Sequence, residues 1–192
     1  MRRVKQLWKV LTHPAELRLA LSGLGMRLCG DISQGSLTVD ETAALIRWAE
    51  GVRTFVEVGT LFGFTARAVA RRTAARVVAV DNFCWNPFGL TSDEHERFTR
   101  RVLENSGIEL VRAEATDFLS SLVGDGTMVF LDGDHSYEGV VCELKLLKKR
   151  GVSVVSGHDY GNAAFGVTRA VREVFGEPDE VVGLCWMKRT GL

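Results

Sequence analysis

The sequence lacks three features that would place it in a specialised class of protein. No apolar run reaches the roughly 20 residues that a helix needs to cross a bilayer. Basic and acidic side chains balance at 24 each, so the composition offers no electrostatic argument for a nucleic-acid partner. The four cysteines form no Cys-x-x-Cys pair, and none has a histidine at the spacing of a zinc site. We therefore expect a cytoplasmic chain with reduced thiols.

Residues 1–35 differ in composition from the rest of the chain. Basic side chains dominate there, and apolar side chains recur at helical spacing at Val4, Leu7, Trp8 and Leu11. Arginines interrupt the apolar stretch that a cleaved signal peptide would need, so we expect none. The spacing predicts a short basic helical extension that packs on the main domain or on the second subunit of a homodimer. The alternative is peripheral contact of residues 1–12 with an anionic membrane surface.

Residues 36–192 are expected to form one domain, in which apolar strands alternate with amphipathic helices. Thr38 and Glu41 have capping-box spacing and open a helix that ends at Gly51. Strands are expected at residues 55–58, 76–81, 108–112, 127–132 and 152–156, helices at 65–73, 92–105, 116–122, 136–150 and 166–175, and a terminal strand or hairpin within 180–188. This alternation predicts an α/β, Rossmann-like fold with a mainly parallel sheet and helices on both faces.

A glycine turn joins the first strand to the following helix within residues 53–65. Glu57 stands at the end of the strand, where it could accept hydrogen bonds from an ammonium or a hydroxyl group. Gly59 and Gly63 are separated by three residues, which does not match the G-x-G-x-x-G pattern of dinucleotide binders. Ligands of parallel sheets bind beyond the carboxyl ends of the strands, so we interpret this turn as one wall of a ligand site. A tight turn without a ligand is the alternative.

Asp81 ends the next strand, 22 residues after Gly59. An acid at this place in a strand–helix–strand unit can bind both hydroxyls of a ribose. The pair of positions therefore predicts a nucleoside-containing cofactor. The loop at residues 82–91 carries three aromatic side chains, which either cover a ligand or bury the loop against the sheet.

Two further polar groups follow the fourth and fifth strands. Side chains from adjacent strand ends can converge on one ion, because neighbouring strands lie about 4.8 Å apart. Asp132, His158 and Asp159 are thus candidate ligands of a divalent cation such as Mg²⁺, or else the two acids cap the helices that follow, and both interpretations stay open. Asp134 or His135 is the candidate general base, with histidine better matched to neutral pH.

Four sequence elements together carry a resemblance to a known family. They are Val-Glu-Val-Gly-Thr-x-x-Gly, the Val-Asp that ends the second strand, Phe-Leu-Asp-Gly-Asp-His-Ser-Tyr-Glu-Gly-Val, and Gly-His-Asp-Tyr with the later Gly-Val-x-x-Ala-Val. Over residues 38–190 the chain resembles the class I S-adenosylmethionine-dependent methyltransferases. It is most similar to the small-molecule O-methyltransferase-like group that includes macrocin-type and cephalosporin-hydroxylase-type proteins.

The resemblance implies S-adenosylmethionine (SAM) as cofactor and assigns residues to it. Glu57, Gly59 and Gly63 would hold its methionine end, Asp81 its ribose, and the region of Glu114 and Ala115 its adenine. We therefore expect the cofactor to be bound by Glu57, Gly59, Thr60, Gly63, Asp81, Asn82, Glu114, Ala115 and Asp132. Metal-dependent members carry an acid at the position of Asp132 and two at the end of the fifth strand, where this chain has His158 and Asp159.

The predicted function is methyl transfer from SAM to an oxygen of a small-molecule acceptor. Such a displacement needs positioning of the donor and removal of the acceptor proton, which suits Asp134 or His135. The alternative is a non-catalytic nucleotide-binding or membrane-associated module on the same fold. The acceptor has no readable code in the sequence.

Overall fold

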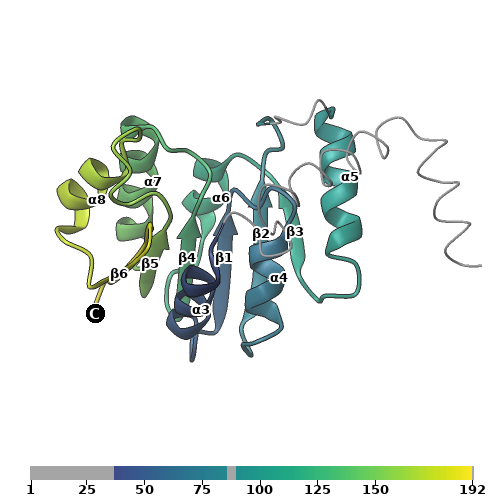
Figure 1. The fold of residues 1–192 in the computed structure, drawn as a ribbon, viewed down its shortest axis with the longest axis horizontal. Helices are drawn as coiled ribbons and strands as arrows, with labels where there is room; N and C mark the ends of the chain where they lie inside the picture. Colours follow the sequence, from purple (N-terminus) through teal and green to yellow (C-terminus); the bar gives the residue numbers. More distant parts are fainter. Residues whose placement is uncertain (1–36, 86–89, 192) are drawn as a thin grey trace, which may run out of the picture.

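The computed structural model describes residues 37–85 and 90–191 (Figure 1). The predicted basic extension at residues 1–35, with its membrane-contacting residues 1–12, lies outside the described residues. Among the helices that the structure does describe, none combines the length and the apolar character needed to cross a membrane.

The predicted mainly parallel sheet is confirmed as a seven-stranded sheet of order β3-β2-β1-β4-β5-β7-β6. Its parallel strands are β1 (Thr54–Val58), β2 (Arg76–Asp81), β3 (Glu109–Arg112), β4 (Thr127–Leu131) and β5 (Val154–Gly157). The predicted terminal hairpin is β6 (Glu180–Val182) and β7 (Cys185–Arg189), and β7 pairs antiparallel with β5. The strand order reverses between β1 and β4, which is where ligands of such sheets bind.

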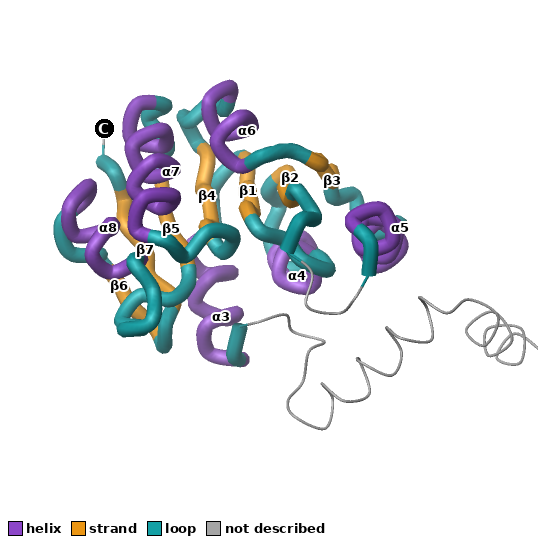
Figure 2. The backbone as a smooth tube through the Cα atoms, turned by 90° about the horizontal axis from the view of Figure 1, so that it is seen from above, coloured by secondary structure: helices purple, strands orange, loops and turns teal. Residues whose placement is uncertain are grey.

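Helices cover both faces of the sheet, as predicted (Figure 2). One face is packed by α6 (Ala115–Ser121), α7 (Tyr137–Lys149) and α8 (Val167–Phe175), and the other by α3 (Val39–Trp48) and α4 (Phe64–Ala70), with α5 (Ser92–Val102) beyond β3. Successive strand residues point to opposite faces. Val56 and Val58 therefore join the core under α6, α7 and α8, whereas Phe55 joins the core under α3 and α4. Because both faces are covered, the strands are apolar almost throughout.

The first described helix is tied to the last hairpin. Thr38 caps α3 and forms the predicted capping box with Glu41. The same Glu41 side chain accepts a hydrogen bond from the backbone N–H of Leu184 at 2.7 Å, and the indole N–H of Trp48 donates to Glu180 at 2.8 Å. These contacts pack α3 against β6 and β7 and place Glu41 beside the end of β5.

Candidate active site

A cavity of about 790 Å³ lies at the carboxyl ends of the parallel strands, around the point where strand order reverses. It brings together nearly all the residues predicted from the sequence. The predicted residues in its lining are Glu57, Gly59, Thr60, Asp81, Asn82, Glu114, Ala115, Asp132, Asp134, His135, His158 and Asp159. Gly63 is the exception. It adopts φ 77° as the N-cap of α4, and a Cβ there would lie 2.6 Å from the Leu103 side chain.

Gly59 sits where the turn after β1 touches the end of β4. Its φ is 83°, in the left-handed region that favours glycine, and a Cβ would lie 2.3 Å from the Asp132 carbonyl oxygen. The backbone N–H of Asp132 donates to the Val58 carbonyl at 2.9 Å and holds the two segments in this position. The approach brings the glycine turn and Asp132 together in the lining of the cavity.

Asp81 fixes two turns through its carboxylate. One oxygen accepts the backbone N–H of Leu61 at 2.8 Å and the other accepts that of Phe83 at 2.7 Å. Leu61 and Phe83 have φ of 50° and 59°, so two non-glycine residues are held in the left-handed region. Each carboxylate oxygen has a second lone pair, and the partly exposed side chain lines the cavity, so Asp81 can still accept from a ligand.

Two side chains of α5 hold the same turn from behind, and no sequence pattern pointed to either. His95 Nε2 lies 2.9 Å from the Leu61 carbonyl oxygen, and the Thr99 hydroxyl donates to that oxygen at 2.7 Å. Burial lowers the pKa of His95, so its ring is neutral. Because a carbonyl only accepts, Nε2 carries the proton. His95 thus acts as a buried support for the turn.

Glu57 is a buried carboxyl group at the floor of the glycine turn. It is 2 % exposed and accepts a hydrogen bond from the Thr60 hydroxyl. Burial raises its pKa to about 8, and the negative charge of Asp132 acts in the same direction. A cationic ligand group would reverse this shift, because an opposite charge favours the ionised form.

The loop after β2 contains one aromatic side chain that is buried against the protein and one that lines the cavity. Phe83 is fully buried and packs edge-on against His95, with ring centroids 5.0 Å apart. Trp85 is 68 % exposed and lines the cavity. Asn82 donates from its amide to Glu114 at 3.1 Å, which ties this loop to the start of α6. The third aromatic of the loop, Phe88, lies outside the described residues.

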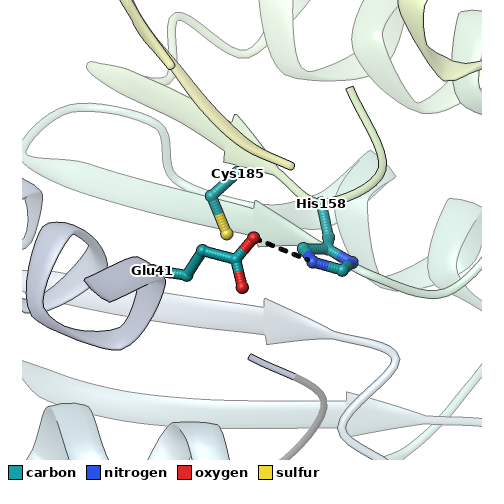
Figure 3. A group of neighbouring side chains, drawn as sticks. All are labelled: Glu41, His158 and Cys185. Atoms are coloured by element: carbon teal, nitrogen blue, oxygen red, sulfur yellow. Dashed lines mark ion pairs between the residues drawn. The ribbon is translucent and has the colours of Figure 1, made fainter. Parts of the chain in front are cut away.

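His158 lies between acids on both sides of its ring. Its Nδ1 is 3.6 Å from Asp132 Oδ1 and 3.5 Å from Asp159 Oδ2. Its Nε2 is 3.6 Å from Glu41 Oε1, and Figure 3 shows the Cys185 sulfur close to this pair. The ligand atoms of Asp132, His158 and Asp159 lie within 4.8 Å of one another, and those of Glu41, His158 and Cys185 do likewise. The predicted convergence of the two strand ends is therefore present.

The Glu41 side of His158 is occupied by internal bonds. Glu41 accepts from the Leu184 N–H through Oε1 and from the Thr38 N–H and hydroxyl through Oε2, both of the latter at 2.8 Å. Burial, followed by the negative charge of Glu41, raises the pKa of the Cys185 thiol, so the sulfur is uncharged. This side therefore orients the His158 ring, and the side facing Asp132 and Asp159 belongs to the cavity.

The two candidate bases have different partners. Asp134 accepts the Ser136 N–H at 2.7 Å, and its other oxygen lies so close to Gly139 that a Cβ there would be 1.8 Å away. The His135 Nδ1 lies 3.1 Å from Asp159 Oδ2, and its ring packs on Phe165 with centroids 4.8 Å apart. Asp134 is thus engaged at the start of α7, whereas His135 is oriented by a carboxylate that leaves its Nε2 for another partner.

Comparison with known proteins places this geometry in a family. Residues 56–173, more than half of the chain, match the family model described as methyltransferase domain. The comparison with curated protein sequences found no match.

Solved structures share the fold at low sequence identity. The O-methyltransferase TomG from Streptomyces achromogenes, in complex with SAM, is 17% identical over 96% of this chain and 95% of that one, with a TM-score of 0.57. Cofactor-bound Rv0187 from MTB is 21% identical over 94% and 85%, with a TM-score of 0.54. An O-methyltransferase from Bacillus cereus, in complex with SAH, is 16% identical over 89% and 82%, with a TM-score of 0.53. The chain therefore belongs to the methyltransferase domain family, and it is a methyltransferase with the class I, SAM-dependent fold.

Proposed function

We propose that this protein transfers a methyl group from SAM to an oxygen of a small-molecule acceptor. The observation that carries the proposal is the division of one cavity into two chemically different walls. Acids at the ends of β1 and β2 line one wall, and the histidines and acids that follow β4 and β5 line the other. The fold neighbours include O-methyltransferases, and one of them is described as involved in tomaymycin synthesis. The Asp-Gly-Asp-His-Ser-Tyr element further favours the macrocin and cephalosporin-hydroxylase type of small-molecule enzyme.

The chemistry of the first wall fits the groups of SAM. Glu57, beside Gly59 and Thr60, would take the ammonium of the methionine end, and Gly63 keeps the turn in shape. Asp81 and Asn82 would take the ribose hydroxyls, since Asp81 keeps free lone pairs. Glu114 and Ala115 would lie along the adenine, and Asp132 would lie between donor and acceptor. When bound, SAM supplies an electrophilic methyl group.

The second wall suits removal of a proton from a hydroxyl group. Asp159 orients His135 through Nδ1, so Nε2 can accept a proton from the acceptor oxygen. Phe165 beside this ring is 42 % exposed, and Trp85 is exposed elsewhere in the lining. Flat apolar surfaces of this kind suit a phenolic or other ring-bearing acceptor.

Replacing His135 tests its role as the base. In the His135→Gln variant we expect kcat to fall by about 10²- to 10⁴-fold, because general-base assistance is lost. The Kd for S-adenosylhomocysteine (SAH) should stay unchanged. The measurement is SAH formation with a panel of phenolic and sugar acceptors, together with calorimetric titration. Asp134→Asn is the matched comparison, and a greater loss of kcat in that variant would move the role to Asp134.

Glu57 should release a proton when the cofactor binds. With a pKa of about 8 it is roughly nine-tenths protonated at pH 7, and a neighbouring ammonium favours its ionised form. SAH affinity should therefore rise as the pH rises from 6 to 8 and level off above 8. Calorimetry at pH 7 in buffers of different ionisation enthalpy measures the released proton directly. Unaltered proton release in Glu57→Gln would assign the effect to another group.

We also propose a divalent cation of the Mg²⁺ class at Asp132, His158 and Asp159. The support is the convergence of two carboxylates and an imidazole nitrogen within 4.8 Å. Such an ion would act as a Lewis acid toward the acceptor hydroxyl. The competing arrangement holds no ion, and the His158 ring contacts the two acids directly.

Titration with Mn²⁺ separates these arrangements. We expect one bound ion per chain and a loss of binding in Asp159→Asn. Binding is measured by calorimetry or electron paramagnetic resonance. Asp134→Asn is the control and should bind the ion normally. Absence of binding at millimolar Mn²⁺, with activity insensitive to a chelator, would eliminate the cation.

A further inference from the structure

One buried acid in the cavity has no role in the function described so far. Glu143 lies in the middle of α7 and is 3 % exposed. Its Oε2 is buried and has no hydrogen-bond partner among the described residues. Buried polar atoms are nearly always hydrogen-bonded, so an unpartnered carboxyl oxygen calls for an explanation. Glu143 also lines the cavity, so a ligand bound there would explain this oxygen by supplying its missing partner.

The position of Glu143 assigns it to one end of the cavity. Gly139, one helical turn earlier on the same face of α7, lines the cavity too, and its missing side chain makes room for the Asp134 carboxylate, which acts on Glu143. Ala115 and Thr116 at the start of α6 belong to the same lining. Helices α6 and α7 pack side by side on one face of the sheet (Figure 2). Glu143 therefore belongs to the wall that α6 and α7 form together, which also carries Ala115 and Thr116.

Within residues 37–85 and 90–191, no opposite charge explains the presence of an acid at this position. The charged group that acts on Glu143 is Asp134, which has the same sign. Its neighbours on the buried face of α7 are Val140, Leu144 and Leu147. An unpartnered acid among apolar side chains costs stability that a leucine would recover. A carboxyl group here thus has a use only if something in the cavity bonds to it.

We propose that Glu143 recognises the amino edge of the adenine ring of the bound cofactor. The inference rests on the proposed function, because it takes the nucleoside to lie with its ribose on Asp81. A base that extends from Asp81 along Glu114 and Ala115 would present its edge to the wall that Glu143 belongs to. Glu143 is then a specificity-determining residue for the donor.

The chemistry of the two groups is complementary. The amino edge of adenine offers one N–H donor and one ring-nitrogen acceptor side by side. A protonated carboxyl group offers one acceptor and one donor in the same arrangement. Burial raises the pKa of Glu143 to about 8, so the group is mainly neutral at pH 7 and can serve in both ways.

The test combines three variants with two ligands. Calorimetry with SAH and with its 6-deamino analogue, which carries purine in place of adenine, should show wild type preferring SAH by about tenfold, the value of one net hydrogen bond. Glu143→Leu should bind both ligands equally and should lose about tenfold in SAH affinity. Glu143→Gln keeps a donor and an acceptor, so its SAH affinity should stay within about threefold of wild type. Glu138→Gln, on the exposed part of the same helix, is the control and should match wild type.

A stability measurement separates ligand recognition from a structural role. We expect Glu143→Leu to melt at a higher temperature than wild type without ligand, because an apolar side chain replaces an unpartnered acid. A lower melting temperature, or a preference for SAH that persists in Glu143→Leu, would overturn the inference. Unchanged SAH affinity with a loss confined to the acceptor would overturn it as well. If wild type binds no SAH, the proposed function fails first and this inference falls with it.

Discussion

The close approach of Gly59 to the backbone of Asp132 is the constraint on which the rest of the site depends. A side chain at Gly59 would collide with the end of β4, so only glycine lets these strands meet as they do. The approach also requires the left-handed backbone at this residue. Through it the turn that carries Glu57 and Thr60 lies beside the segment that carries Asp132 and His135, and both line the same cavity. Donor and acceptor chemistry can then take place in one cavity.

Packing behind the turn keeps this approach in place. His95 and Thr99 hold the Leu61 carbonyl, and Asp81 holds the Leu61 N–H, so both backbone polar groups of this residue are fixed, one from α5 and one from β2. The site is therefore preorganised by groups that a ligand need not touch. Preorganisation of this kind lowers the cost of ordering the site when a ligand binds.

Acids dominate the cavity, and the fold manages their charge in two ways. Glu57 and Glu143 are buried deeply enough to be mainly protonated at neutral pH. Asp132 and Asp159 instead face the imidazole of His158. A ligand with a positive group and hydrogen-bonding edges would complete both arrangements. The methyl donor proposed here has such groups.

The fold and the placement of most site residues could be predicted from the sequence. Apolar strands alternating with helices fixed the parallel sheet, and the rule that ligands bind at strand ends selected Glu57, Asp81, Asp132 and His158. Local patterns were sufficient because these residues lie next to the strands that position them.

The remaining contacts could not be predicted, since they join residues far apart in the chain. Glu41 accepts the N–H of Leu184, which lies 143 residues away in the chain. In the sequence, its place in a capping box already explained why an acid stands there, so no second contact was expected. His95 reaches Leu61 from a helix whose register against the turn depends on tertiary packing. Glu143 did leave a signal, because it shares helical spacing with Val140, Leu144 and Leu147 and is therefore an acid on an apolar face.

The central claim is that the cavity between Gly59 and Asp81 binds the methyl donor. Calorimetric titration of the 192-residue chain with SAH, repeated on Asp81→Asn, tests it most directly. We predict one SAH per chain for wild type and at least tenfold weaker binding for the variant, because one oxygen that accepts hydrogen bonds is replaced by an amide that donates them. Absence of binding to wild type, or equal affinity in the variant, would contradict the account.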